Sequence, residues 1–118
     1  MDWPDLIVAS YERFVGEWLC LAEELDDLPA VVLCHDTSSD PVFVYANHAA
    51  RDLWGLPLVG MASRLSAPPE ARDERAAALA SGTVVRGYSG IRVAASGRRF
   101  RIHDATVWTV VDADGVVR

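Results

Sequence analysis

The chain has 118 residues, 51% of them hydrophobic, and a formal net charge of −6. This length suits a single domain with its own buried core, and the composition excludes a disordered chain. No apolar run reaches the roughly 18 residues of a membrane span. The acidic start MDWPDL lacks the basic residues of a secretory signal, so we expect a cytoplasmic protein.

Charge is distributed unevenly along the chain. Residues 1–40 carry ten carboxylates and one arginine, residues 41–118 carry seven carboxylates and ten arginines, and lysine is absent. The two parts can therefore complement each other within one chain or across a homodimer. Because the total is acidic, we expect no nucleic-acid partner.

The first predicted element is an amphipathic helix over residues 2–24. Its apolar residues recur at steps of three and four, Asp2 can cap its first turn, and Gly16 can kink or split it. We assign residues 1–28 to this N-terminal helical extension and residues 29–118 to the domain proper. The helix either covers the domain's own sheet or forms a homodimer contact, and the sequence leaves both alternatives open.

Next come two short strands, the second followed directly by a helix. The run AVVLC at 30–34 predicts a buried strand, and a loop returns the chain into the run VFVY at 42–45. Asn47 is a good helix N-cap, and Gly55 stands where a left-handed C-cap belongs. After a stretch rich in proline and glycine, a further helix is predicted from about residue 69 to residue 80.

The last third of the chain predicts a long β-hairpin. Two runs of β-forming residues within 83–111 meet at Ser96 and Gly97, which we interpret as a two-residue turn. In this register, Ser89 lies opposite Asp104 on an apolar face of the hairpin. The final three residues begin one more strand after the turn DADG.

Four segments of the chain match a known family: VVLCHDTSSDPVFVYANHAARDLWG, SRLSA, YSGIRV and GRRFRIHDATVW. Together they resemble the MEKHLA domain, a PAS-like family, over about residues 30–115, and the chain is similar to the family's small bacterial stand-alone members. The resemblance implies an α+β fold, with a PAS-like antiparallel sheet of about five strands and helices on one face. It also implies a sensory or interaction role and no enzymatic activity.

The last strand of such a sheet is central, but only residues 116–118 remain for it here. A strand this short leaves backbone groups of its neighbours unpaired. Another segment, an altered sheet or a second chain has to complete the structure, and the sequence does not decide among them.

A small-molecule pocket is expected between the sheet and the helices. Its centre is Asp104 with Ser89, since a carboxylate on an apolar face needs hydrogen-bond partners. The alternative is a register one residue away, or a strand bulge, that lets Asp104 reach solvent. The candidate pocket residues are Asn47, Trp54, Arg64, Tyr88, Ser89, Asp104 and Trp108.

A basic patch is the second candidate site, as an anion site or a partner surface. In the predicted register Arg92 lies opposite Arg101, and like charges in such positions need a neutralising group. Carboxylates of the N-terminal helix, Glu12 and Glu17 among them, are one such group, and an anionic ligand or an acidic protein is the other. The patch consists of Arg92, Arg99, Arg101 and His103.

No metal or known cofactor is expected. The three histidines lie in different elements without metal-ligand spacing. A PAS-type haem would use a histidine on the helix over 69–80, and a flavin photoadduct would use a cysteine after Gly55, and the sequence has neither. Cys20 and Cys34 are interpreted as small buried hydrophobic residues.

We interpret the chain as a PAS-like sensory or interaction module that binds a small molecule, a protein partner or both, without catalysis. It would form a homodimer through the N-terminal helix or the sheet. One alternative is a small cone-shaped enzyme of the ketosteroid-isomerase kind, with Asp104 as general base in a deep apolar cavity. A second alternative is a ligand-free dimerisation domain.

Overall fold

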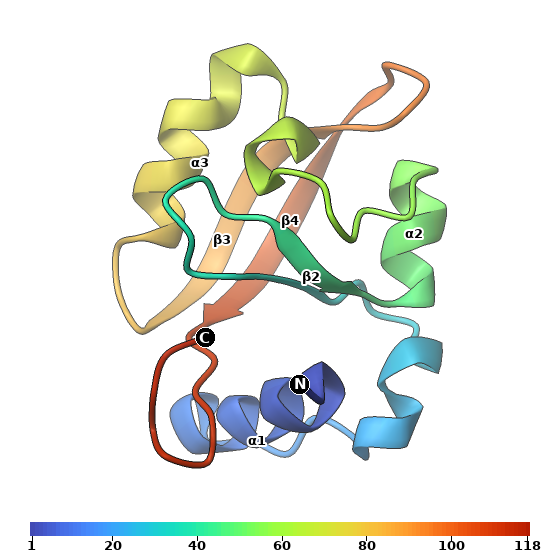
Figure 1. Ribbon diagram of the computed structural model, residues 1–118. Helices are drawn as coiled ribbons and strands as arrows, with labels where there is room; N and C mark the ends of the chain where they lie inside the picture. Colours follow the sequence, from blue (N-terminus) through green and yellow to red (C-terminus); the bar gives the residue numbers. More distant parts are fainter.

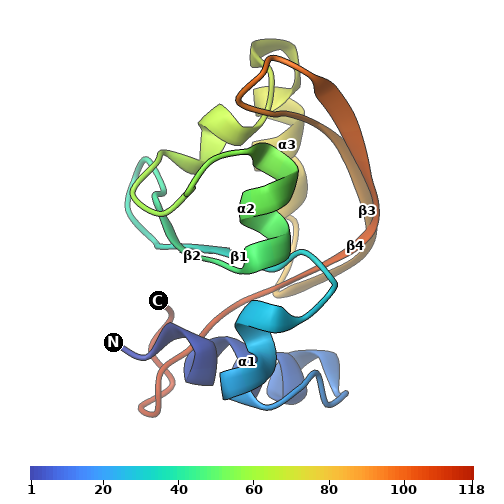
Figure 2. The same cartoon turned by 90° about the vertical axis from the view of Figure 1, so that its right-hand side faces the viewer.

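The computed structural model describes all 118 residues, and a long, curved hairpin forms one side of the molecule (Figures 1 and 2). In chain order the elements are α1 (Trp3–Val15), the 3₁₀-helix η1 (Ala22–Asp27), β1 (Leu33–His35), β2 (Phe43–Ala46), α2 (His48–Trp54), the 3₁₀-helices η2 (Ser63–Ser66) and η3 (Pro69–Ala71), α3 (Arg72–Leu79), β3 (Val84–Val93) and β4 (Arg99–Trp108). Figure 2 shows α2 and α3 on the concave side of the β3–β4 hairpin. Strand β1 pairs with β2, and β3 pairs with β4.

Helix α1 begins and ends at the predicted signals. The carboxylate of Asp2 accepts a hydrogen bond from the Asp5 N–H at 3.3 Å. Gly16 ends the helix in the left-handed region with φ +83°, where a residue without a Cβ is favoured. Gly16 therefore splits the predicted helix, and η1 forms a separate turn. No helix of the chain is long and apolar enough to cross a membrane.

The inner face of α1 packs on the domain's own core. Ile7 is 1% exposed and belongs to one buried cluster with Val32 and Val110, which flank the two ladders. The Ser10 hydroxyl accepts a hydrogen bond from the Val111 N–H at 3.0 Å. Of the two alternatives for this helix, the structure shows the one in which it covers its own domain.

Asn47 connects three segments from a fully buried position. Its Oδ1 accepts hydrogen bonds from the N–H groups of Ala50, in α2, at 3.1 Å and Val32, before β1, at 3.0 Å. Its Nδ2 donates to the carbonyl oxygens of Leu25 at 3.2 Å and Ala30 at 2.8 Å. The predicted N-cap is thus confirmed, and the same amide also fixes the chain between η1 and β1.

The β3–β4 hairpin has a loop one residue longer than predicted. The Ala94 N–H donates to the Arg98 carbonyl at 2.9 Å, which leaves three residues in the loop, the last of them Gly97 with φ +85°. Such a loop with a left-handed third residue is a common hairpin connection. Arg92 therefore pairs with Phe100 rather than Arg101. The predicted register is wrong by one residue, and this slip turns Arg92 to the inner face.

Strand β4 has a bulge at Asp104, which has φ +50°. The register shifts there, and Tyr88 pairs with Ala105. Ser89 and Asp104 are both exposed. The pairing of Ser89 with Asp104 on an apolar face is therefore wrong, and the alternative of a shifted register and a strand bulge is confirmed, because the bulge directs the carboxylate to solvent.

The last residues fold back on the end of the β4 segment. Val117 forms an isolated antiparallel bridge with Val111, and the Arg118 N–H donates to the Val110 carbonyl at 2.9 Å. The α+β class agrees with the prediction, but four strands form two ladders instead of one sheet of about five. The outer edges of β1 and β4 therefore have no neighbouring strand.

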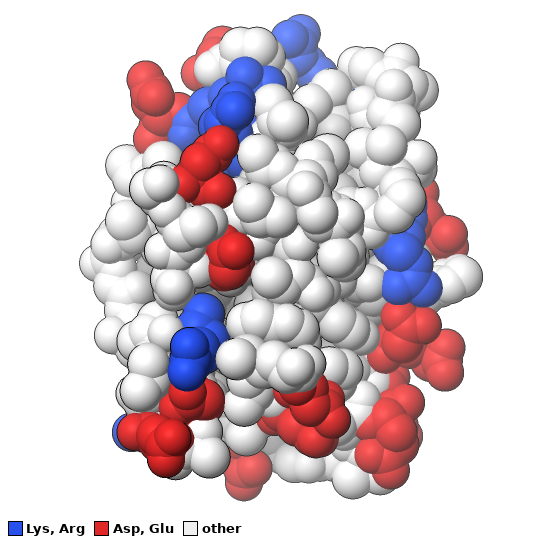
Figure 3. Space-filling view, viewed as in Figure 1, with Lys and Arg blue, Asp and Glu red and all other residues white.

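Charge is unevenly distributed over the surface. Figure 3 shows mostly carboxylates at the lower end of this face, where α1 lies. One ion pair joins the acidic segment to α2, since Arg51 Nη1 lies 2.9 Å from Asp26 Oδ1. Its hydrogen bond to Arg51 holds the pKa of the Asp26 carboxyl below its ordinary value.

Replacing Asn47 with alanine tests its connecting role. We expect Asn47→Ala to lower the free energy of unfolding by about 3 kcal/mol, because several buried backbone groups lose their partner at once. Urea unfolding followed by circular dichroism measures this. Asp52→Ala, on the same helix, removes only an exposed contact with His48 and should change stability by less than about 0.5 kcal/mol. Equal, small effects of the two substitutions would contradict the assignment.

Candidate functional site

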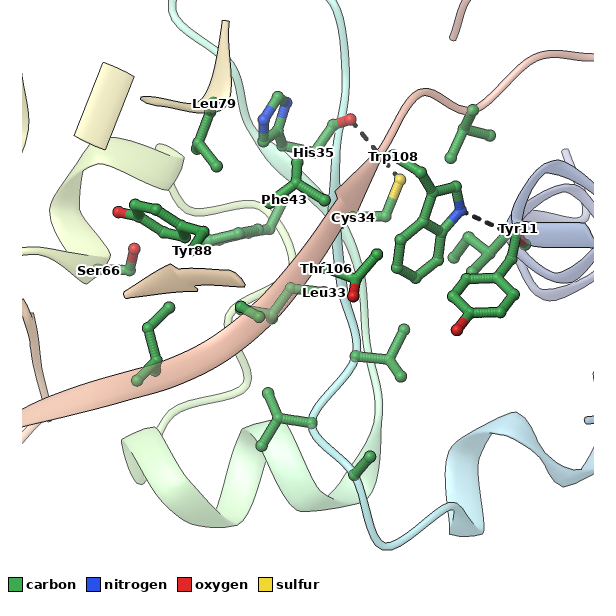
Figure 4. A pocket seen from close by; sticks show the side chains of 18 of the residues that line it. Tyr11, Leu33, Cys34, His35, Phe43, Ser66, Leu79, Tyr88, Thr106 and Trp108 are labelled. Atoms are coloured by element: carbon green, nitrogen blue, oxygen red, sulfur yellow. Dashed lines mark hydrogen bonds between the residues drawn. The ribbon is translucent and has the colours of Figure 1, made fainter. Parts of the chain in front are cut away.

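A groove of about 790 Å³ lies along the inner face of the β3–β4 hairpin. Residues of α1, β1, β2, α2, η2 and α3 also line it, and most of the lining side chains are hydrophobic. Figure 4 shows Tyr88 and Ser66 at one end and Trp108 and Tyr11 at the other. The groove therefore runs from the α3 end of the hairpin to helix α1.

The groove owes its length to the separation of the two ladders. In an antiparallel pair, the backbone groups of alternate residues point toward and away from the partner strand. The Val32 carbonyl accepts a hydrogen bond from the Asn47 N–H on the side of β2. The backbone N–H and carbonyl of the next residue, Leu33, therefore point away from β2. Likewise, the Thr109 N–H donates to the Thr83 carbonyl on the side of β3. The backbone groups of Trp108 therefore point away from β3. Strands β1 and β4 thus each line the groove with an edge whose backbone groups have no partner strand.

Two buried arginines lie at the end of the groove near α3. Arg75 of α3 is 8% exposed and Arg92 of β3 is 5% exposed. Arg92 donates from Nη2 to the Tyr88 hydroxyl at 3.2 Å and from Nη1 to the Ile91 carbonyl at 3.0 Å. Its guanidinium carbon lies 5.5 Å from the centre of the Tyr88 ring, within cation–π range. The Arg75 Nε is buried without a hydrogen-bond partner.

Arg75 and Arg92 are two positive charges that are both shielded from solvent. Burial, and after it the positive charge of Arg92, lowers the pKa of the Arg75 guanidinium to about 10. The five ion pairs of the protein use other arginines and His48. This end of the groove therefore carries positive charge that no carboxylate of the chain neutralises.

Gly90 leaves the space in which this arrangement forms. It lies between Tyr88 and Arg92 on the inner face of β3. A Cβ at this position would lie 2.5 Å from the Tyr88 hydroxyl oxygen and 3.0 Å from Arg92 Nη1. A larger residue would therefore displace the ends of both side chains.

Four of the predicted pocket residues line the groove: Trp54, Tyr88, Asp104 and Trp108. Trp54 is 1% exposed, and its Nε1 donates to the Ser66 carbonyl at 3.3 Å. Its ring meets that of Phe100 edge to face, with the centroids 5.2 Å apart. Trp54 is thus both a core residue and a wall of the groove.

Three of the predicted pocket residues lie elsewhere. Asn47 is buried between η1, β1 and α2, away from the groove lining. Arg64 is exposed and pairs with Asp40 at 3.1 Å. Ser89 is exposed on the outer face of β3. Of the three, Asn47 has a structural role in the hydrogen bonds of the core.

The predicted basic patch is divided between the two faces of the hairpin. Arg92 is buried inside, whereas Arg99, Arg101 and His103 are exposed. Arg99 Nη2 lies 2.9 Å from a carboxylate oxygen of Glu70, just before α3. The expected pairing with carboxylates of the N-terminal helix is therefore wrong, because Arg99 lies at the loop end of β4, within reach of Glu70.

Arg75 is a site residue that the sequence analysis did not select. Its neighbours four residues before and after are Ala71, which is buried, and Leu79, which is half-buried. Positions four apart share one face of a helix. This spacing was the available signal that Arg75 points inward rather than into solvent.

The exposed Asp104 does not fit the enzyme alternative. A general base of the ketosteroid-isomerase kind lies in an apolar cavity, whereas Asp104 lies at the bulge in contact with solvent. The buried charged groups of the groove are the two arginines at its α3 end, and no buried carboxylate lines it. The geometry thus counts against catalysis by this residue.

Cys34 is the thiol that lines the groove. Burial, and after it the charge of Asp36, raises its pKa to about 12, so the thiol stays protonated at neutral pH. Both cysteines are buried and free, as predicted. No group of three or more His, Cys, Asp or Glu side chains could hold a metal ion. That neither haem nor a flavin photoadduct forms here stays a prediction.

The family model of the MEKHLA domain matches residues 1–118 of the chain. The match includes the N-terminal helix, which lies outside the residues that carry the resemblance in the sequence. No curated protein sequence matches the chain significantly.

Solved structures of light receptors share the fold. An RNA-binding Light-Oxygen-Voltage receptor is 22% identical, with a TM-score of 0.64, over 80% of this chain and 28% of that one. The photo-excited blue-light photoreceptor Vivid is 22% identical, with a TM-score of 0.57, over 75% of this chain and 71% of that one. A Vivid variant is 21% identical, with a TM-score of 0.57 and 75% coverage of both chains. The fold is therefore PAS-like.

The raised pKa of Cys34 predicts how stability changes at alkaline pH. In the unfolded chain the thiol ionises near its ordinary pKa of 9.0, whereas in the folded chain it stays neutral until about 12. Stability should therefore be complete below pH 9 and fall as the pH rises through this window. Urea unfolding at several pH values measures the fall.

The same series on Cys34→Ala provides the control. Both proteins carry Cys20→Ala, so that Cys34 is the thiol under test. The Cys34→Ala variant should lose less stability at alkaline pH, by the amount that ionisation of the Cys34 thiol contributes. At neutral pH, iodoacetamide should modify Cys34 much more slowly in the folded protein than in the urea-unfolded chain, because the folded thiol is protonated. Rapid modification of the folded protein would contradict a buried, protonated thiol.

Proposed function

The chain belongs to the MEKHLA domain family, and we propose that it works as a sensory module that binds a small molecule and has no catalytic activity. The observation that carries the proposal is the groove. Its volume of about 790 Å³ and its mostly apolar lining, with a few converging polar groups, are typical of ligand sites. A ligand there would contact both ladders at once.

The route from the groove to the N-terminal helix runs through Trp108. This side chain lines the groove, and its Nε1 donates to the Ile7 carbonyl of α1 at 3.2 Å. Its ring also meets Tyr11 of α1 edge to face, with the centroids 4.8 Å apart. A ligand that favours one position of β4 would therefore shift the population of α1 positions.

Native mass spectrometry tests the proposal most directly. We expect the purified protein to carry a small molecule that is lost on denaturation, and the visible absorption spectrum to show no band of a haem or flavin. Added ligand should raise the melting temperature, because it binds the folded chain alone. A protein that purifies empty and whose melting temperature responds to no compound of a metabolite library would contradict the function.

We also propose a homodimer, formed by the outer edge of β3, because the free edge of β4 lines the groove. The apolar face of α1 is already buried in the monomer, which leaves the sheet as the contact. An unpaired strand edge is a template for a second chain. Sedimentation equilibrium measures the association, and a monomer over the whole concentration range would contradict it.

Replacing Trp108 with phenylalanine tests the route to α1. Trp108→Phe keeps the aromatic ring in the groove but removes the donor to Ile7, a loss of about 1 kcal/mol. Hydrogen exchange across residues 3–15 should become roughly fivefold faster, while exchange in β3 stays unchanged. Trp18→Phe is the matched control, since Trp18 is 63% exposed. Equal exchange in the two variants would exclude the route.

A further inference from the structure

The buried arginine pair lacks the carboxylate partners that such groups normally have. Arginine is almost never fully buried unless it is paired, because an isolated charge in the protein interior is destabilising. Here Arg75 and Arg92 both line the groove, and the Nε of Arg75 has no hydrogen-bond partner. After burial, the positive charge of Arg92 is the second cause that lowers the pKa of Arg75.

The carboxylates of the groove do not supply the missing negative charge. Only Asp36 and Asp104 are among its lining residues. Asp36 accepts hydrogen bonds from the Ser38 hydroxyl at 2.6 Å and the Val42 N–H at 3.0 Å, within its own loop. Asp104 is exposed at the bulge. Asp73 and Glu74, within α3, are exposed and form no ion pair with either arginine. Glu70, just before α3, pairs with Arg99 at the surface.

We infer that Arg75, Arg92 and Tyr88 hold the oxyanion head, a carboxylate or a phosphate, of an otherwise apolar small molecule. This inference rests on the proposed function and names the chemistry of its ligand. Guanidinium groups donate two parallel hydrogen bonds to either head group. The Tyr88 hydroxyl, which accepts from Arg92, keeps its own hydrogen available for the anion.

The rest of the groove fits an apolar tail. Beyond the arginines, the lining includes Phe43, Trp54 and Phe100, and it continues along β4 toward Trp108. The charged end is buried and the far end is apolar, so a molecule with one anionic end has a single favourable orientation. Gly90 contributes by leaving Tyr88 and Arg92 free to approach each other.

The experiment compares four probes of related shape. Decanoate and decyl phosphate carry the two anionic heads, decanol carries the tail alone, and inorganic phosphate carries a head alone. Binding is measured by titration calorimetry, and stability by the melting temperature at constant ionic strength. We expect one of the two anionic amphiphiles to bind at least about tenfold more tightly than decanol, as for hydrogen bonds to a charged group.

Three arginine variants show whether the effect belongs to this pair. Arg75→Met and Arg92→Met should each remove the tenfold advantage of the anionic head while decanol binding remains. Arg101→Met removes the same charge from the exposed rim of the groove and should leave the advantage in place. Without ligand, Arg75→Met should unfold at the same or a higher temperature, because no ion pair is lost.

The outcomes separate the inference from the proposed function. Decanol that binds as tightly as both anionic amphiphiles would overturn the anion site and leave the apolar groove in place. No binding by any of the three amphiphiles would overturn the small-molecule function itself. A loss of advantage in Arg101→Met equal to that in Arg92→Met would also overturn the site, since only the general charge would then matter. Gly90→Ala should weaken the anionic probes alone.

Discussion

The three-residue loop between β3 and β4 decides which side chains of the hairpin face the interior. Its last residue, Gly97, has φ +85°, a conformation that glycine adopts without strain. With this loop, Tyr88, Gly90 and Arg92 come to the inner face of β3, where Phe100 pairs with Arg92. A loop one residue shorter would turn Arg92 to solvent and leave Arg75 as the only buried arginine of the groove. The chemistry of the site therefore depends on a turn at the far tip of the hairpin.

The two ladders are held together without a shared strand. Asn47 ties β1 and α2 to η1, and Trp108 ties β4 to α1. Both connections pass around the groove instead of across it. Because no strand joins the edges of β1 and β4, a molecule in the groove would be their direct bridge. An architecture of this kind makes the relative position of the ladders sensitive to what the groove contains.

Local signals in the sequence predicted the elements, whereas long-range pairing was harder to predict. Asn47 and Gly55 mark the ends of α2 because caps act on the backbone within a few residues. The register of the hairpin depended on assigning one residue to the loop or to a strand, and that choice reversed the face of Arg92. Arg75 was missed because α3 is short and rich in alanine, so its buried face has little hydrophobic periodicity. The α+β class was predicted, and Arg92 was predicted as an anion-site residue, but the sequence did not show that Arg75 and Arg92 share the groove.

The arginine pair gives the groove a property that an apolar cavity lacks. Arg75 belongs to α3 and Arg92 to β3, so repulsion between them acts to separate a helix from the hairpin on which it packs. An anion between them reverses the sign of this interaction and draws the two elements together. An apolar ligand of the same shape would fill the groove without changing that force. Occupancy by an anion would in this way draw α3 toward the hairpin, and Trp108, at the other end of the same hairpin, is placed to pass that change to α1.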